Sequence, residues 1–343
     1  MNSFLFNKTS DMLDYINSST DLSHIIFSGI AQVEELSQIV GHNVVLCSTS
    51  GEFTSQGYKE NVITGFSYKS DAAEVVEILY PPAKSLKGLH SAYSKVKNNS
   101  NAFTLLLCDG LSAMEEAIIT SFYFTDPNFK IMGGSAGDNL KFEKTLIYIG
   151  SKKVHSVAVF FNMKKRTQLI KENIYVPSGL KLLVTEANTI KRVVKTFNNK
   201  PASEEYARAL GVREAELSKY FINNPLGKIS KDDIYIASPM KVNPDKSITF
   251  YCQLIPNTFV ELLKPSDYYQ EISRTISKAS FSPSFVLSIH CILRSLKFID
   301  ENAWDNVSSK LLSLTKNQTG FISYGEQYYR NHLNQTMIML LVE

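Results

Sequence analysis

Three short loops of the sequence combine hydroxyl, carboxylate and glycine residues directly after an apolar run. Hydroxyls and carboxylates exchange hydrogen bonds with polar molecules, and glycine lets backbone N–H groups come close to a ligand. The same residue types also form ordinary turns. The candidate ligand-binding residues are Cys47, Ser48 and Thr49 in the first loop, Asp109 in the second, and Gly133, Gly134, Ser135, Ala136, Gly137 and Asp138 in the third.

The third loop also satisfies the G-x-S-x-G pattern of a hydrolase nucleophile, with Ser135 as the reacting residue. That motif requires a strand before the serine and a helix directly after it. Residues 138–144 are polar, lack helical spacing and lead into another apolar run. A serine hydrolase is therefore kept as an alternative, and we expect the protein not to be an enzyme.

The six histidines show no spacing typical of a zinc site. One histidine is enough to ligate haem iron, so haem stays open as a cofactor and the cofactor itself is not determined. His290 is the candidate ligand because it lies in an apolar run, where a hydrogen-bonded core histidine is the competing interpretation. The four cysteines are dispersed, which is typical of buried apolar residues.

Two further groups of polar residues stand at predicted strand ends near the C-terminus. They supply a phenol, a carboxylate and an amide, which suit hydrogen bonding to a small molecule but could equally satisfy one another. These candidate residues are Tyr324, Gly325 and Glu326 in one group and Asn334 and Thr336 in the other.

Apolar periodicity predicts alternating helices and strands that would position these loops. If the strands before the first three loops are parallel, the loops gather at the carboxyl edge of one sheet. The predicted fold class is α+β, with two mixed α/β sandwich-like halves. An echo between Gly137-Asp138 and Gly325-Glu326, each followed by an apolar strand, leaves duplication of the halves open. Helices are predicted over 30–40, 84–97, 112–122, 203–210, 266–278 and 304–314, and strands over 43–47, 62–68, 73–80, 103–108, 129–132, 146–150, 154–161, 234–237, 248–254, 259–263, 285–292, 321–324 and 336–342.

Composition narrows the class of protein. The chain has 343 residues, enough for two domains, and its 44% hydrophobic content can form a large core. A net charge of +3 is too small for a general nucleic-acid binder. No apolar run approaches the roughly 20 residues of a membrane span, and the N-terminus does not resemble a secretion signal, so we expect a cytoplasmic protein without membrane insertion.

Taken together, these motifs resemble the FIST proteins, intracellular sensory modules with an N-terminal and a C-terminal part. The resemblance covers roughly residues 25–343 and implies an N-terminal extension (1–24), a FIST N-terminal domain (25–202) and a FIST C-terminal domain (203–343). Its departures are Ala237 before Ser238-Pro239, Asn257 after Pro256, and Ile292-Leu293 within the C-x-x-R stretch. The matching segments beyond the first three loops are Asn224-Pro225-Leu226-Gly227, Cys291 to Arg294, Gly320 to Glu326, and Asn334-Gln335-Thr336.

The resemblance implies a bacterial signal-input protein that binds a small ligand, such as an amino acid or a similar metabolite. It would act on a separate protein partner, such as a histidine kinase of a two-component system or a chemotaxis protein. Some relatives are haem proteins that sense nitric oxide and regulate histidine kinases, which is the alternative function. In the expected site, backbone amides and Arg294 receive anionic or carbonyl groups, while Asp138 or Glu326 receives an amine.

Overall fold

The computed structural model describes residues 1–123, 126–230 and 233–343. The chain forms two compact units, and their bounds differ from the domains expected from sequence. Unit 1 consists of Met1–Glu172, Ile272–His332 and Met337–Glu343, and unit 2 consists of Asn173–Glu271 and Leu333–Thr336. The chain leaves unit 1 after Glu172 and returns at Ile272, so unit 2 is an insertion. Residues 1–24, expected as an extension, contribute a strand and a helix to unit 1.

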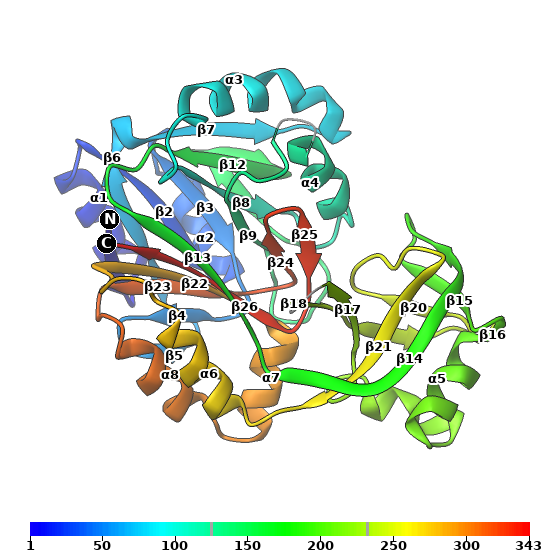
Figure 1. The fold of residues 1–343 in the computed structure, drawn as a ribbon. Helices are drawn as coiled ribbons and strands as arrows, with labels where there is room; N and C mark the ends of the chain where they lie inside the picture. Colours follow the sequence, from blue (N-terminus) through cyan, green and yellow to red (C-terminus); the bar gives the residue numbers. More distant parts are fainter. Residues whose placement is uncertain (124–125, 231–232) are drawn as a thin grey trace. The chain divides into compact units, whose positions relative to one another are not determined.

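Within the described residues, unit 1 is built on three six-stranded mixed sheets (Figure 1). Sheet 1 has the order β1 (Asn2–Phe6), β6 (Ile63–Lys69), β2 (Leu22–Ser28), β3 (Val44–Ser48), β10 (Ile147–Ile149) and β11 (Lys152–Val154). Sheet 2 has the order β25 (Asn331–Leu333), β24 (Glu326–Tyr328), β9 (Ile131–Ser135), β8 (Phe103–Cys108), β12 (Ser156–Phe161) and β7 (Ala73–Ile78). Sheet 3 has the order β13 (Thr167–Asn173), β26 (Thr336–Val342), β22 (Phe285–Cys291), β23 (Gln318–Ser323), β4 (Glu52–Thr54) and β5 (Gly57–Lys59).

The three sheets share one pairing pattern. Each has a central parallel pair, β2 with β3, β8 with β9, and β22 with β23. The first strand of each pair also lies antiparallel to the last strand of the same chain segment, which is β6, β12 or β26. The second strand pairs with a short hairpin. The helices that join the parallel pairs are α2 (Ile30–Ser37), α4 (Glu115–Tyr123), and α7 (Ile292–Asp300) with α8 (Trp304–Leu312).

The hairpins are exchanged between the three segments in a cycle. β4 and β5 follow β3 in the chain, but β4 pairs with β23. β10 and β11 follow β9, but β10 pairs with β3, and β24 follows β23 but pairs with β9. Unit 1 therefore consists, over its described residues, of three interlocked repeats: β1 to β6, β7 to β12, and β13 with β22 to β26. The sequence echo at Gly137-Asp138 and Gly325-Glu326 marks two of these three copies.

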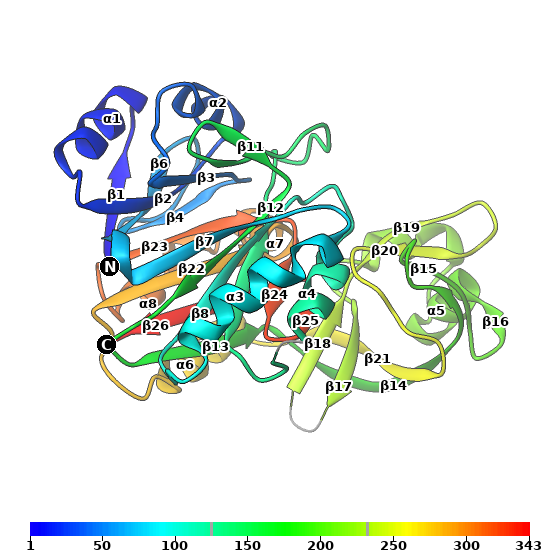
Figure 2. The ribbon, with the colours of Figure 1, turned by 90° about the horizontal axis from the view of Figure 1, so that it is seen from above.

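Helices cover the outer faces of the first two sheets (Figure 2). Aromatic residues pack between the inner faces. The outer helices include α1 (Thr9–Ser18) on sheet 1 and α3 (Leu86–Val96) on sheet 2. On the inner faces Phe27 stacks on Phe321, and the Phe66 ring contacts both Phe161 and Phe285. Because these rings come from all three sheets, one core holds the repeats together.

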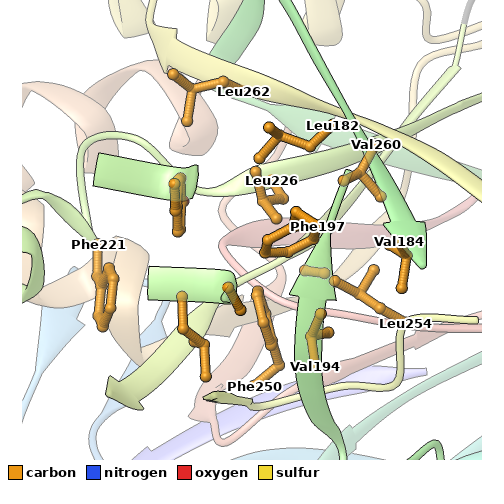
Figure 3. Packing of buried hydrophobic residues seen from close by; sticks show 14 of the residues in the cluster. Leu182, Val184, Val194, Phe197, Phe221, Leu226, Phe250, Leu254, Val260 and Leu262 are labelled. Atoms are coloured by element: carbon orange, nitrogen blue, oxygen red, sulfur yellow. The ribbon is translucent and has the colours of Figure 1, made fainter. Parts of the chain in front are cut away.

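Unit 2 contains an antiparallel eight-stranded sheet with a helix on one face. Tyr206 of α5 (Ala202–Leu210) is buried with Phe197, Val184 and Leu226 of the sheet (Figure 3). The strand order is β18 (Asp233–Ala237), β17 (Leu226–Ser230), β21 (Thr258–Pro265), β14 (Tyr175–Asn188), β15 (Val193–Phe197), β20 (Ile248–Phe250) and β19 (Pro239–Val242), with β16 (Lys200–Pro201) beside β15. The remaining helical segments of the chain are α6 (Tyr268–Ser277) and the 3₁₀ turns Ser70–Ala72, Pro82–Ser85 and Glu214–Tyr220.

The mixed α/β class is confirmed, and several predicted elements are present with close bounds. The predicted strand 103–108 is β8, and the C-terminal strand is β26, which lies between β13 and β22. Asp267 caps α6, because its Oδ1 accepts the amides of Tyr269 and Gln270. Among the helices of the described chain, none has both the length and the apolar character that a membrane span requires.

Candidate functional site

In each repeat of unit 1, the same four-residue sequence pattern stands at the end of the second strand of the parallel pair. It begins at the last residue of β9 and of β23, and one residue after the end of β3. The pattern is a hydroxyl residue, any residue, glycine and an acid. The three copies are Thr49-Ser50-Gly51-Glu52, Ser135-Ala136-Gly137-Asp138 and Ser323-Tyr324-Gly325-Glu326. These loops were predicted separately from the sequence, and neither Glu52 nor Ser323 was among the predicted site residues. Aligning the hydroxyl-x-glycine-acid pattern across the three strand ends would have identified both residues.

The three loops meet through backbone hydrogen bonds between repeats. The Ser50 amide donates to the carbonyl of Ile322 at 3.1 Å, and the Gly137 amide donates to the carbonyl of Ser48 at 3.0 Å. The Ser135 amide donates to the carbonyl of Gly325 at 2.9 Å. The three motif loops therefore lie together, and they stand at the ends of strands from three different sheets. Of the three loops predicted to share one sheet edge, those after β8 and β9 belong to parallel strands of sheet 2, whereas the first follows β3 of sheet 1.

The acids of the three motifs are almost fully buried. Glu52, Asp138 and Glu326 have exposed fractions of 1%, 3% and 0%. In the first motif the Thr49 hydroxyl donates to Glu52 Oε1 at 2.6 Å, and in the third the Ser323 hydroxyl donates to Glu326 Oε1 at the same distance. The first and third motifs therefore hold their acid with their own hydroxyl.

The second motif departs from this arrangement. Ser135 donates to Glu115 Oε1 at 2.9 Å, and its own acid is the shorter aspartate. Asp138 instead accepts the backbone amides of residues 142, 143 and 144 at 2.7–3.0 Å, together with the hydroxyl of Tyr324. Burial by itself raises the pKa of Asp138, but these hydrogen bonds outweigh it and lower the pKa below its usual value. Asp138 is thus an ionised anchor for the chain that follows it.

A cavity of about 180 Å³ lies beside the first motif. Its walls include Thr49 and Glu52, the first turn of α2, and Asp138, Asn139 and Lys141. Gly29 at the N-cap of α2 supplies no side-chain cap, and the first turn of a helix presents N–H groups that favour a negatively charged group. The cavity thus combines a buried carboxyl, a lysine and a helix N-terminus, which suits a small molecule with both donors and acceptors.

Glu52 differs electrostatically from an ordinary surface glutamate. Burial raises its pKa to about 7, against the opposing hydrogen bonds from Thr49 and from the amide of Val62. Glu60, which also lines the cavity, raises the pKa of Glu52 further. Glu52 therefore exchanges its proton near neutral pH, and it can act as donor or acceptor toward a ligand.

This raised pKa gives a testable pH dependence. The unfolded chain releases the Glu52 proton near pH 4.5 and the folded chain near pH 7, so this group lowers stability as the pH rises between those values. We expect Glu52→Gln, which stays neutral, to be more stable than the wild type at pH 8 by up to about 3 kcal/mol and similar to it at pH 4.5. Urea unfolding at both pH values measures this difference, and parallel stability curves for the two proteins would contradict it.

Other residues expected in the site have structural partners near the motifs. Ser48 donates to the carbonyl of Gly137 at 2.8 Å and accepts the amide of Leu146. Asp109 accepts the hydroxyl of Thr145 at 2.6 Å. Cys47 is buried, and burial raises the pKa of its thiol. The hydrogen bonds of Ser48 and Asp109 and the burial of Cys47 stabilise the loops that carry the motifs.

Gly133 and Gly134 lie inside strand β9, where side chains have no room. A Cβ on Gly133 would lie 2.2 Å from the carbonyl oxygen of Leu106, and one on Gly134 would lie 2.6 Å from the Phe321 ring. These glycines therefore allow close packing between strands and between sheets. The turn-forming or ligand-approach role expected from the sequence is not what their surroundings require.

Arg294 and His290 lie together in the core of unit 1. Arg294 Nη2 is 3.0 Å from Glu172 Oε2, and both side chains have an exposed fraction of 0%. Arg294 Nη1 is also 3.0 Å from His290 Nδ1, and His290 Nε2 is 3.0 Å from the Ser288 hydroxyl. Burial and the nearby Arg294 lower the pKa of His290. Because both ring nitrogens are hydrogen-bonded, this histidine does not fit as a haem ligand.

Asn334 and Thr336 belong to unit 2. The side-chain oxygen of Asn334 accepts the amide of Ser238 at 3.2 Å. The structure therefore assigns these two expected site residues to a different unit from the three motifs. Across the described residues, no three His, Cys, Asp or Glu side chains are grouped as a metal site would require.

The surroundings of Ser135 are unlike those of a hydrolase nucleophile. Its side chain is fully buried, and its hydroxyl contacts Glu115 and Gln327. His332 Nδ1 lies 3.3 Å from Gln327 Nε2. Residues 136–146 after β9 are not helical, as expected from the sequence.

Comparison with known protein families identifies the family of this chain. The model of the FIST N domain matches residues 22–200, which is more than half of the chain. The chain belongs to the FIST family. The FIST C domain matches residues 202–329, and a search of curated proteins found no match. FIST domains are sensory domains of signal transduction. The boundary between the two FIST matches falls inside unit 2, so neither match coincides with a compact unit.

Proposed function

We propose that this FIST protein is a cytoplasmic signal-input protein that binds a small polar ligand in the cavity beside Glu52. The observation that carries the proposal is a cavity of about 180 Å³ walled by two of the three repeated motifs. The ligand is an amino acid or a similar metabolite. Its ammonium group meets Glu52, and its carboxylate meets Lys141 and the N-terminus of α2.

The output of this input protein is a conformational change passed to a separate signalling protein. A histidine kinase of a two-component system or a chemotaxis protein is the proposed partner. The family supports a sensory role of this kind. We take the protein to be without enzymatic activity, because Ser135 is buried and its hydroxyl contacts a carboxylate and an amide. Ester turnover that disappears in Ser135→Ala would contradict this point.

Isothermal titration of the purified protein with the common amino acids tests the ligand site. We expect at least one to bind, and we expect Glu52→Gln and Lys141→Ala each to weaken it by about tenfold, the loss expected for one hydrogen bond to a charged group. Glu326→Gln is the matched control, because it changes the same motif position with the same hydroxyl contact but outside the residues lining the cavity. Equal weakening by all three variants, or no binding at all, would count against this site.

A further inference from the structure

Residues 139–144, which we call the strap, join the second motif to the hairpin that follows it. Asn139 and Lys141 line the cavity beside Glu52. Leu140, between these two residues, has an exposed fraction of 37%, and Phe142, directly after Lys141, has one of 46%. The strap therefore alternates between residues that face the cavity and large apolar residues that face solvent.

Three side chains hold the strap in place. The Ser50 hydroxyl oxygen accepts the amide of Asn139, the first residue of the strap, at 3.0 Å. Asp138 accepts three amides from its second half, and the Tyr324 hydroxyl accepts the amide of Leu140 at 2.6 Å. The Tyr324 hydroxyl in turn donates to Asp138, and its ring stacks on Phe142 with centroids 5.2 Å apart. These contacts hold a strained backbone, because Leu140 and Phe142 have φ values of 63° and 54°, which non-glycine residues rarely adopt.

Comparison of the three repeats shows that the strap is specific to the second one. Glu52 and Glu326 are themselves the first residues of the hairpin strands β4 and β24. After Asp138, the hairpin strand β10 begins only at Ile147. The second repeat therefore has additional residues between its acid and its hairpin. Asp138 accepts the backbone amides of these residues, whereas Glu52 and Glu326 each accept the hydroxyl of their own motif.

The far end of the strap is attached more weakly. Lys144 Nζ is 2.7 Å from Glu34 Oε1 of α2, and both side chains are about half exposed. Exposed ion pairs of this kind contribute little to stability. Release of Asp138 and Tyr324 would therefore leave the strap attached at its first residue through Ser50 and at its last residue through this weak contact with α2, whose first turn also lines the cavity.

We propose that the strap is a movable wall of the ligand cavity, held closed by Asp138 and Tyr324, whose release changes the surface presented by Leu140 and Phe142. This assignment rests on the proposed function in treating the cavity as a ligand site. A ligand that contacts Asn139 or Lys141 acts directly on the strap. The cavity and the exposed surface are then linked through one short segment.

Amide hydrogen exchange of the ligand-free protein tests whether the strap can be released locally. We expect exchange in peptides covering 140–144 to rise by about tenfold in Tyr324→Phe, which keeps the stacked ring and removes only the hydroxyl. Asp138→Glu should have the same effect although it keeps the charge, because the longer acids of the other motifs turn back to a hydroxyl. Tyr80→Phe, which removes a hydroxyl bonded to Ser112 and Ser156 elsewhere in unit 1, should leave these peptides unchanged.

Thiol labelling tests whether the strap is a wall of the cavity. The four native cysteines are buried, so Thr49→Cys introduces a reporter at a cavity-lining position. Methyl methanethiosulfonate should react with this cysteine about tenfold faster when Tyr324→Phe is also present. Labelling that is insensitive to Tyr324→Phe, or faster exchange spread evenly over unit 1, would overturn the proposal. Failure of every amino acid to bind would refute the proposed ligand and leave these two measurements unaffected.

Discussion

Replacing Arg294 by methionine is expected to lower the free energy of unfolding by about 3–5 kcal/mol. The guanidinium and the Glu172 carboxylate form an ion pair with no exposed surface, and the substitution would remove the positive charge 3.0 Å from that buried carboxylate. Urea unfolding followed by circular dichroism measures the loss. The double variant Arg294→Met/Glu172→Leu is expected to recover most of it, because both members of the ion pair are then replaced by apolar side chains.

Arg166→Met provides the matched control for this prediction. Arg166 forms a comparable pair with Glu343, but both side chains are about half exposed, so its loss is expected to cost less than about 1 kcal/mol. The two roles considered for Arg294 give opposite results. If Arg294→Met left the stability unchanged but abolished amino-acid binding, the result would support the ligand-binding role predicted for Arg294 from the sequence.

Gly133→Ala is expected to destabilise the protein by a similar amount, through a steric clash. The added methyl group would lie 2.2 Å from the backbone oxygen of Leu106, its partner in the parallel strand β8. Relief requires β9 to move within a fully buried sheet, so we expect a loss of at least about 3 kcal/mol or failure to fold. Thermal unfolding and the yield of soluble protein measure this outcome.

Gly88→Ala is the control for the glycine prediction. Gly88 lies in helix α3, where the nearest atom to an added Cβ is Val76 Cγ1 at 3.4 Å. Alanine favours a helix over glycine, so this variant is expected to gain about 0.5–1 kcal/mol. If Gly133→Ala were as stable as the wild type and only ligand binding were lost, the glycine would serve ligand approach and not packing.

Local sequence patterns predicted the elements that are long and apolar. The runs 103–108 and 336–342 correspond to β8 and β26, because a strand buried on both faces has an apolar residue at nearly every position. The three-residue strands β4, β5 and β10 carry no comparable signal. Their sheet partners are set by contacts between repeats, which periodicity within a segment does not encode.

Only part of the candidate site was predicted from the sequence, because local patterns identify loops after apolar strands but not contacts between distant segments. Ser48, Thr49, Asp138 and Tyr324 were identified because their loops follow recognisable strands. Arg294 was included because it lies in the C-x-x-R stretch of the resemblance, and His290 because one histidine in an apolar run is enough to ligate haem iron. The ion pair of Arg294 with Glu172 joins positions more than 100 residues apart and could not be predicted from local sequence. Glu52 was not among the predicted site residues, although it ends the first candidate loop.

The exchanged hairpins also set an order for folding during synthesis. Sheet 1 takes all its strands from residues 2–154, so it can be completed while the rest of the chain is still on the ribosome. Sheet 2 has four of its strands by residue 161 but lacks β24 and β25, which follow residue 325. The edge of β9 therefore stays open until β24 and β25 have been synthesised. While residues 136–325 are being added, the nascent chain exposes an unpaired strand edge, and such edges are the ones that chaperones must shield from aggregation.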